Sequence, residues 1–95
     1  MIQVLMEVEG LSSIKDKRRI VKSLKDKLIN KYKLSVAEVD RQDSLRFIHL
    51  GGAYVSNSRQ FGESVMQKAF RFVEENAPGR IINSGIMSEI YNEET

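Results

Sequence analysis

The sequence predicts an α+β fold in which strands and helices follow the order β-α-β-β-α-β. Stretches in which hydrophobic and polar residues alternate, as in a strand, are interrupted by two stretches with the 3.6-residue period of a helix. Turn-forming residues separate these stretches. Of the 95 residues, 41% are hydrophobic and 29% are charged, which is typical of a globular chain. The length predicts a single domain over residues 1–95.

The first predicted strand covers residues 2–9. Its hydrophobic residues alternate with polar ones, so we expect one face to be buried and the other to be wetter. The hydrophobic face carries Ile2, Val4, Met6 and Val8. Gly10 ends this pattern.

The first helix is predicted to begin at Ser12 or Ser13, whose hydroxyl groups can cap the first turn, and to end near Lys31 or Lys33. Its apolar residues fall within one arc of a helical wheel, and many basic residues lie opposite. The apolar arc comprises Ile20, Val21, Leu24, Leu28 and Tyr32. The basic face comprises Lys15, Arg18, Arg19, Lys22, Lys25 and Lys33. Lys17 falls on the apolar side, where we expect its stem to follow the sheet edge with its ammonium group in water.

Two further strands are predicted over residues 35–41 and 46–56. They contain β-branched and aromatic residues, and the polar residues between them have turn character. Gly51 and Gly52 lie in the middle of the longer strand. They indicate either a bulge or a group that packs close against the backbone.

The second helix is predicted to begin after Asn57 or Ser58 and to end near Asn76, because Pro78 cannot continue a helix. The last strand is predicted over residues 80–91. This order of elements is that of the ferredoxin-like fold. We therefore expect a four-stranded antiparallel sheet of order 4-1-3-2 with both helices on one face.

The predicted topology brings three distant segments to one end of the sheet. They are residues 10–18, 40–46 and 76–80. We expect Lys15, Asp16, Lys17 and Arg18 to lie near Asp40, Gln42 and Asp43.

The composition excludes several kinds of site. The chain has no cysteine and one histidine, which rules out disulfides, thiolate nucleophiles, Cys-ligated metals and a paired-histidine metal site within one chain. No Ser-His-Asp arrangement can be assembled around His49, which we expect to be a half-exposed residue of the third strand. We expect no metal, no cofactor and a binding module in preference to an enzyme.

The N-terminal segment lacks the features of a targeting signal, because no basic residue precedes its apolar run and Glu7 and Glu9 interrupt it. No stretch approaches the about 20 apolar residues of a membrane span. We expect a cytoplasmic protein without membrane contact.

Positive charge is concentrated in the first third of the chain. Residues 1–33 hold nine Lys and Arg against four Asp and Glu, whereas residues 34–95 hold six against nine. The first helix carries most of this excess, and its basic face can follow a phosphate backbone and release counterions. The alternative is a helix surface that serves solubility alone.

Two smaller groups of polar residues each have a binding interpretation and a structural one. A candidate anion site at the start of the first helix comprises Ser12, Ser13, Lys15 and Lys17. The alternative is that the serines only cap the helix and the lysines pair with acids. A polar cluster at the end of the sheet comprises Asp16, Glu38, Asp40, Gln42 and Asp43. Its oxygens suit magnesium or calcium, but the basic residues nearby favour ion pairs.

The sheet face that the helices leave open is predicted to carry Leu5, Phe47 and Val55. Such an apolar surface favours a homodimer through this face or through a strand edge. Phe47 is the one aromatic residue placed to stack on an RNA base there, since we expect Tyr54 to face the helices.

Several motifs resemble a known bacterial family. They are Ser13-Ile14-Lys15-Asp16-Lys17-Arg18-Arg19, Val21-Lys22-Ser23-Leu24, Ser35-Val36-Ala37-Glu38-Val39-Asp40, Gln42-Asp43, Leu50-Gly51, Val55-Ser56-Asn57 and Phe72-Val73-Glu74-Glu75. In order and spacing they resemble the YlxP-like proteins, domain-of-unknown-function family 503. The chain departs from that pattern at Leu45, where the family usually has an aromatic residue, and at Phe47, where it often has a basic or polar one.

The resemblance implies a ferredoxin-like fold and no established activity. It also points to RNA or ribosomes, because genes of the family tend to lie among those of translation and ribosome maturation factors. We therefore expect a non-enzymatic RNA- or ribosome-associated module that uses the basic face of the first helix. The alternative is a protein or enzyme that binds a small phosphate or other anion at the start of that helix.

Overall fold

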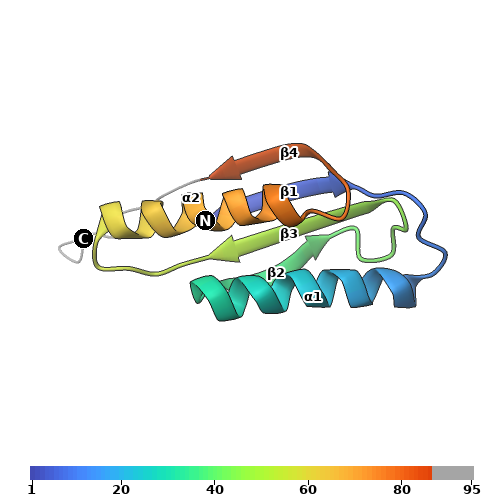
Figure 1. The fold of residues 1–95 in the computed structure, drawn as a ribbon, viewed down its shortest axis with the longest axis horizontal. Coiled ribbons are helices and arrows are strands. Elements are labelled where there is room, and N and C mark those ends of the chain that lie inside the picture. The colour runs from blue at the N-terminus through green and yellow to red at the C-terminus, as the bar shows by residue number, and fades with distance from the viewer. Residues whose placement is uncertain (87–95) are drawn as a thin grey trace.

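The computed structural model describes residues 1–86 and contains the six predicted elements in the predicted order (Figure 1). They are β1 (Ile2–Glu7), α1 (Ile14–Tyr32), β2 (Ser35–Asp40), β3 (Phe47–Ala53), α2 (Arg59–Asn76) and β4 (Arg80–Ile86). The part of the last predicted strand that follows Ile86 lies outside the described residues.

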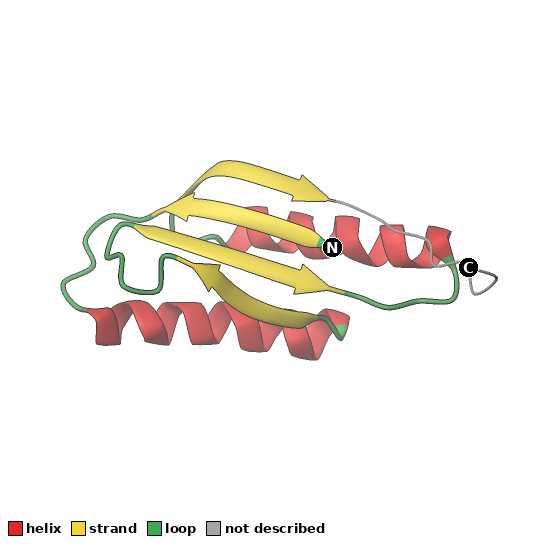
Figure 2. Ribbon diagram, turned by 180° about the vertical axis from the view of Figure 1, so that it is seen from behind, coloured by secondary structure: helices red, strands yellow, loops and turns green. Residues whose placement is uncertain are grey.

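The four strands form one antiparallel sheet of order β2-β3-β1-β4. Read from its other edge, this is the predicted order 4-1-3-2. Both helices cover the same face, which is in front in Figure 1, and Figure 2 looks onto the open face. The loops that follow β1, β2 and α2 meet at one end of the sheet (Figure 1). The prediction of a ferredoxin-like fold is confirmed.

The core lies between the sheet and the helices, and the predicted hydrophobic face of β1 forms its centre. Met6 is fully buried, and the other apolar residues of that face are at most 5% exposed. The core is composed of Ile2, Val4, Met6, Val8, Val21, Leu24, Leu28, Leu34, Ile48, Leu50, Met66, Ala69 and Val73. The helical periods of both α1 and α2 therefore point their apolar arcs to the sheet.

Serine residues begin both helices. Ser13 caps α1 and accepts a hydrogen bond of 3.2 Å from the backbone N–H of Asp16. Ser58 caps α2 and accepts one of 3.3 Å from Phe61. These bonds satisfy donors that the first turn of a helix leaves free. At the other end of α1, Lys33 takes a left-handed conformation (φ 59°) and its N–H donates to the carbonyl of Ile29.

The third strand is shorter than predicted, and this changes the open face. β3 ends at Ala53 because its pairing with β1 ends at Ile2, opposite Gly52, and its pairing with β2 ends at Ser35. Val55 lies beyond the sheet and is 95% exposed. Its predicted place on the sheet face is wrong, because no neighbouring strand continues far enough to pair with it.

Gly51, the first of the two adjacent glycines, accommodates a close contact on the open face. A β-carbon added to Gly51 would lie 2.8 Å from Cγ1 of Val39. The irregular register is in β2, between Glu38 and Asp40, and not at the glycines. The second of the two predicted alternatives, close packing against the backbone, is therefore the observed one.

Candidate nucleic-acid interface on the helix layer

The basic face of α1 points away from the sheet. Five of its six predicted residues are exposed, and one, Lys25, is half-buried. The exposed residues are Lys15, Arg18, Arg19, Lys22 and Lys33. Lys22 donates a hydrogen bond of 2.7 Å to the carboxylate of Asp26, one turn further along the helix. Because both partners are solvated, this pair holds its geometry only weakly, and the ammonium group stays accessible to a stronger anion.

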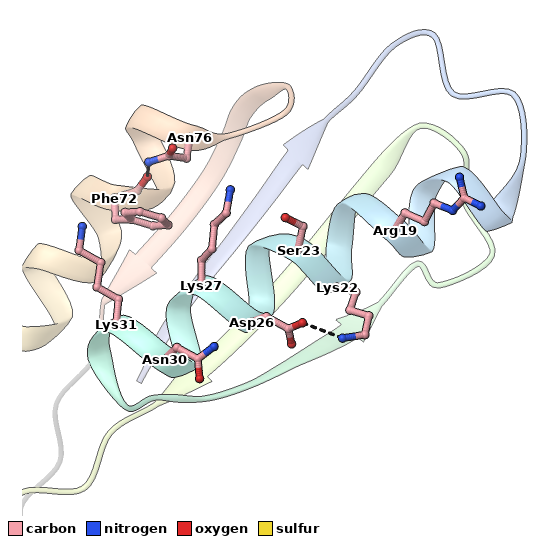
Figure 3. Close-up of a pocket in the computed structure, with 9 residues that line it drawn as sticks. All are labelled: Arg19, Lys22, Ser23, Asp26, Lys27, Asn30, Lys31, Phe72 and Asn76. Carbon is pink, nitrogen blue, oxygen red and sulfur yellow. Dashed lines mark hydrogen bonds and ion pairs between the residues drawn. The ribbon is translucent and has the colours of Figure 1, made fainter.

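A groove of about 830 Å³ runs between α1 and α2 (Figure 3). It is lined by Arg19, Lys22, Ser23, Asp26, Lys27, Asn30 and Lys31 of α1 and by Phe72 and Asn76 of α2. A second hollow of about 270 Å³ shares Arg19, Ser23 and Lys27 with it and reaches Pro78. The groove thus follows α1 along much of its length and is rich in cations.

Phe72 is the aromatic residue that lines the groove, and it packs against Tyr32. The rings of Tyr32 and Phe72 meet edge to face, with their centroids 5.8 Å apart. The ammonium group of Lys31 lies 4.8 Å from the centroid of Phe72 and 5.6 Å from that of Tyr32. In Figure 3, the side chains of Lys27 and Lys31 extend toward α2. The groove therefore offers positive charge beside an aromatic surface.

The predicted basic face omits Lys27 and Lys31. On the helical wheel these two residues lie near the apolar arc and not opposite it, so they are not grouped with the other cations. They face a groove that forms only when α2 packs beside α1. The wheel carries no signal for such a groove, and the sequence gives no reason to place Phe72 next to Lys31.

The start of α1 agrees with the alternative interpretation of the candidate anion site, in which serine caps the helix and a lysine pairs with an acid. Ser13 caps the helix, and the hydroxyl of Ser12 donates a hydrogen bond of 2.8 Å to the carboxylate of Asp16. Lys17 is 1% exposed, so the expectation that its ammonium group lies in water is wrong. That group donates to the backbone carbonyl of Arg41 and pairs with Glu38. Lys15 is exposed.

The polar cluster at the end of the sheet is held by local bonds and one ion pair. The Lys17 ammonium group lies 3.0 Å from Oε2 of Glu38, although that oxygen accepts no well-aligned hydrogen bond. The Asp40 carboxylate accepts a hydrogen bond of 2.7 Å from the N–H of Arg41. The side-chain amide of Gln42 donates one of 3.1 Å to the carbonyl of Glu38.

The predicted meeting of residues 15–18 with residues 40–43 is confirmed by the contact between Lys17 and Arg41. Asp43 is exposed. Within residues 1–86 no three Asp, Glu, His or Cys side chains are arranged to hold a metal ion. The ion pair between Lys17 and Glu38 favours the ion-pair interpretation of this cluster.

His49 lies on the open face of the sheet, opposite Leu5 of β1. Its Nε2 is 2.9 Å from the side-chain oxygen of Gln3. The ring is partly exposed, as predicted.

Neither helix in the described part of the chain is long and apolar enough to cross a membrane.

Comparison with known proteins agrees with the motifs. Residues 1–86 match the model of the family described as "Protein of unknown function (DUF503)". The chain is also similar to the "Uncharacterized protein YlxP" of Bacillus subtilis (strain 168), with 32% identity over 62 residues. That alignment covers 65% of this chain and 67% of the relative. The resemblance that the motifs carry is confirmed: the chain belongs to the DUF503 family.

Proposed function

We propose that this protein is a non-enzymatic RNA-associated module, acting on ribosomal RNA or the ribosome, which binds the phosphate backbone through the basic face of α1. The observation that carries the proposal is the exposure of Lys15, Arg18, Arg19, Lys22 and Lys33 along one helix. A helix of 19 residues is about 28 Å long, so these cations can contact several successive phosphates. Each contact releases counterions, which makes such binding favourable at low salt.

The groove extends this surface on its α2 side. Lys27 and Lys31 add two cations, and Phe72 supplies a ring against which an unpaired base can lie. Charge beside an aromatic surface suits single-stranded segments better than a regular RNA duplex, whose bases are already stacked. We therefore expect the protein to prefer loops and single strands.

The alternative of a small-anion site at the start of α1 has less support. Two of the groups it would use are engaged within the fold, since Lys17 pairs with Glu38 and the hydroxyl of Ser12 bonds to Asp16. Binding of a small anion there would require both to exchange partners. The extended surface needs no such change.

The test compares two triple variants that remove the same charge. The α1 variant combines Lys15→Ala, Arg18→Ala and Lys22→Ala, which removes three exposed cations from the first half of α1. Lys25 is left in place because it is half-buried. Arg59→Ala, Lys68→Ala and Arg71→Ala remove three exposed cations from α2 and serve as the control. Alanine favours helices, so both variants should fold.

Fluorescence anisotropy with labelled single-stranded RNA and with ribosomal RNA fragments measures the affinity over a range of salt. The α1 variant should lose at least tenfold in affinity at low salt, and its slope of log K against log salt should fall by about 2, or about 0.7 for each phosphate contact. The α2 variant should stay close to wild type. Equal losses in both variants would show that only net charge matters, and would reject α1 as the binding surface.

A further inference from the structure

A second cationic cluster lies on the open face of the sheet, on the side that α1 and α2 do not cover. Phe47 of β3, Glu7 of β1 and Arg80 of β4 are register neighbours across the three strands. The carboxylate of Glu7 lies 2.7 Å from Nε of Arg46 and 3.3 Å from Nη2 of Arg80. The guanidinium carbons of Arg41 and Arg46 lie 4.7 Å and 5.5 Å from the centroid of the Phe47 ring.

Three guanidinium groups therefore surround one carboxylate and one aromatic ring. The Glu7 side chain is 17% exposed, whereas those of Arg46 and Arg80 are more than 70% exposed, so the positive charge is the part that meets solvent. A guanidinium that stacks on a ring uses its flat face for the stack and keeps its N–H groups free in the plane. Those N–H groups match the oxygens of a phosphate, which they can bind in pairs.

The backbone of Arg41 shows how this side chain is placed over Phe47. Its φ of 63° is in the left-handed region, which residues other than glycine seldom adopt. Four bonds fix the turn. The carbonyl of Arg41 accepts two hydrogen bonds. One comes from the Lys17 ammonium group, and the other, of 3.0 Å, comes from the N–H of Ser44. The N–H of Arg41 donates to Asp40, and Gln42 donates to the carbonyl of Glu38. Unusual backbone conformations persist where the surroundings enforce them, and they are frequent at binding sites.

The same buried lysine connects the two cationic surfaces. Lys17 belongs to the first turns of α1, and its contact with Arg41 brings the start of the basic helix beside the turn between β2 and β3. Figure 1 shows the loop before α1 and this turn at the same end of the sheet. A strand of RNA that leaves α1 at Lys15 and Arg18 can therefore continue around this end onto the open face.

We infer that Arg41, Arg46 and Arg80 form a second contact site for the same single-stranded RNA, with a phosphate on Arg41 and an unpaired base beside Phe47. Lys17 is a positioning residue, which holds the turn that presents Arg41. The inference rests on the proposed function and adds to it: the RNA wraps the end of the domain instead of lying along one helix. It commits this face to RNA and not to a second copy of the chain.

The test uses Arg41→Gln, with Arg71→Gln as its matched control. Arg71 is an exposed arginine on α2, so its loss changes the net charge equally. Arg41→Gln should weaken binding to single-stranded RNA about tenfold and lower the salt slope by about 0.7. Arg41→Lys keeps the positive charge, so its salt slope should stay at the wild-type value. Its affinity should fall severalfold, because an ammonium group cannot bind phosphate oxygens in pairs. Arg71→Gln should stay within twofold of wild type.

A second measurement needs no variant. Wild-type protein is irradiated with RNA that carries 4-thiouridine, and the crosslinked peptides are identified by mass spectrometry. Crosslinks in residues 41–47 are the expected result. Crosslinks confined to α1 and α2 would overturn the inference, even if Arg41→Gln failed to fold.

The outcomes separate this inference from the proposed function. If the α1 triple variant loses binding while Arg41→Gln behaves like Arg71→Gln, the open-face site is wrong and the α1 surface stands. If the wild-type protein binds no RNA at low salt, both are wrong. The protein could also form a homodimer at the concentrations of the assay. If Phe47→Glu dissociates that dimer and leaves the RNA affinity unchanged, the open face serves self-association instead.

Discussion

The ammonium group of Lys17 lies 3.0 Å from Oε2 of Glu38, and only 1% of the lysine side chain is exposed. This pair joins the start of α1 to β2 beneath the turn that carries Arg41. A charge removed from water in this way must be paired, because an isolated buried charge is strongly destabilising. The pair thus couples the stability of the fold to the geometry of one end of the sheet.

Replacing Lys17 alone should destabilise the protein. Lys17→Met leaves the carboxylate of Glu38 without its partner and frees the carbonyl of Arg41, so we expect a loss of about 3 kcal/mol in the free energy of unfolding. Urea denaturation followed by circular dichroism measures this loss.

The double variant Lys17→Met with Glu38→Leu is the control for this experiment. It removes both charges and fills their space with apolar atoms, so much of the lost stability should return. If Lys17→Met alone is as stable as wild type, the pair is not the constraint that the geometry indicates.

Two glycine substitutions should have opposite effects. A β-carbon at Gly79 would lie 2.1 Å from the backbone oxygen of Glu7, so Gly79→Ala must move either β1 or the turn before β4. We expect it to cost about 1–3 kcal/mol of stability.

Gly62 lies inside α2, and a β-carbon there would meet Ser56 at an ordinary 3.5 Å. Gly62→Ala should therefore stabilise the protein by up to about 1 kcal/mol, through the higher helix propensity of alanine. Thermal unfolding of the two variants side by side checks both signs. A stabilising Gly79→Ala would mean that β1 and the turn before β4 are not in close contact.

Association of two copies through the open sheet face stays a prediction that competes with RNA for the same surface, and the structure leaves fewer apolar residues for such a contact. Val55 lies outside the sheet, and guanidinium groups of Arg41 and Arg46 lie over the ring of Phe47. Of the predicted contact residues, Leu5 and Phe47 remain on this face, and the structure adds the exposed Val39, which lies against Gly51. Light scattering over a range of concentrations measures the mass, and Phe47→Glu should dissociate such a dimer. A monomer mass at high concentration would end this proposal.

Phosphorylated metabolites should leave the melting temperature unchanged. Ser12 and Lys17, two of the groups near the start of α1, are already bonded to Asp16 and Glu38, so a small phosphate finds no ready site there. Thermal shift assays with ribonucleotides and sugar phosphates test this expectation. A genuine site would raise the melting temperature with dose, by several degrees at 100 times its Kd. A dose-dependent rise that Lys15→Ala abolishes would favour the small-anion function over RNA binding.

Local patterns in the sequence determined most of the fold. The alternation of Ile2, Val4 and Met6 shows which face of β1 is buried, because side chains of a strand point to opposite faces in turn. The helical period of α1 does the same for Val21 and Leu24. Serine caps and the stop before Pro78 mark the helix ends, because these signals act within one turn of the chain. The order of the elements then leaves few topologies to choose from.

The tertiary structure alone decided how side chains from distant segments meet. The ammonium group of Lys17 is buried because Glu38 of β2 supplies a carboxylate and Arg41, in the turn after β2, supplies a carbonyl, both more than 20 residues away in the sequence. The ends of neighbouring strands, not its own alternating pattern, place Val55 outside the sheet. Lys31 meets Phe72 only where α1 and α2 pack side by side, and Arg41 meets Phe47 only through a left-handed turn. Such contacts depend on strand register and helix packing, which arise from interactions summed over the whole core and leave no local pattern in the sequence.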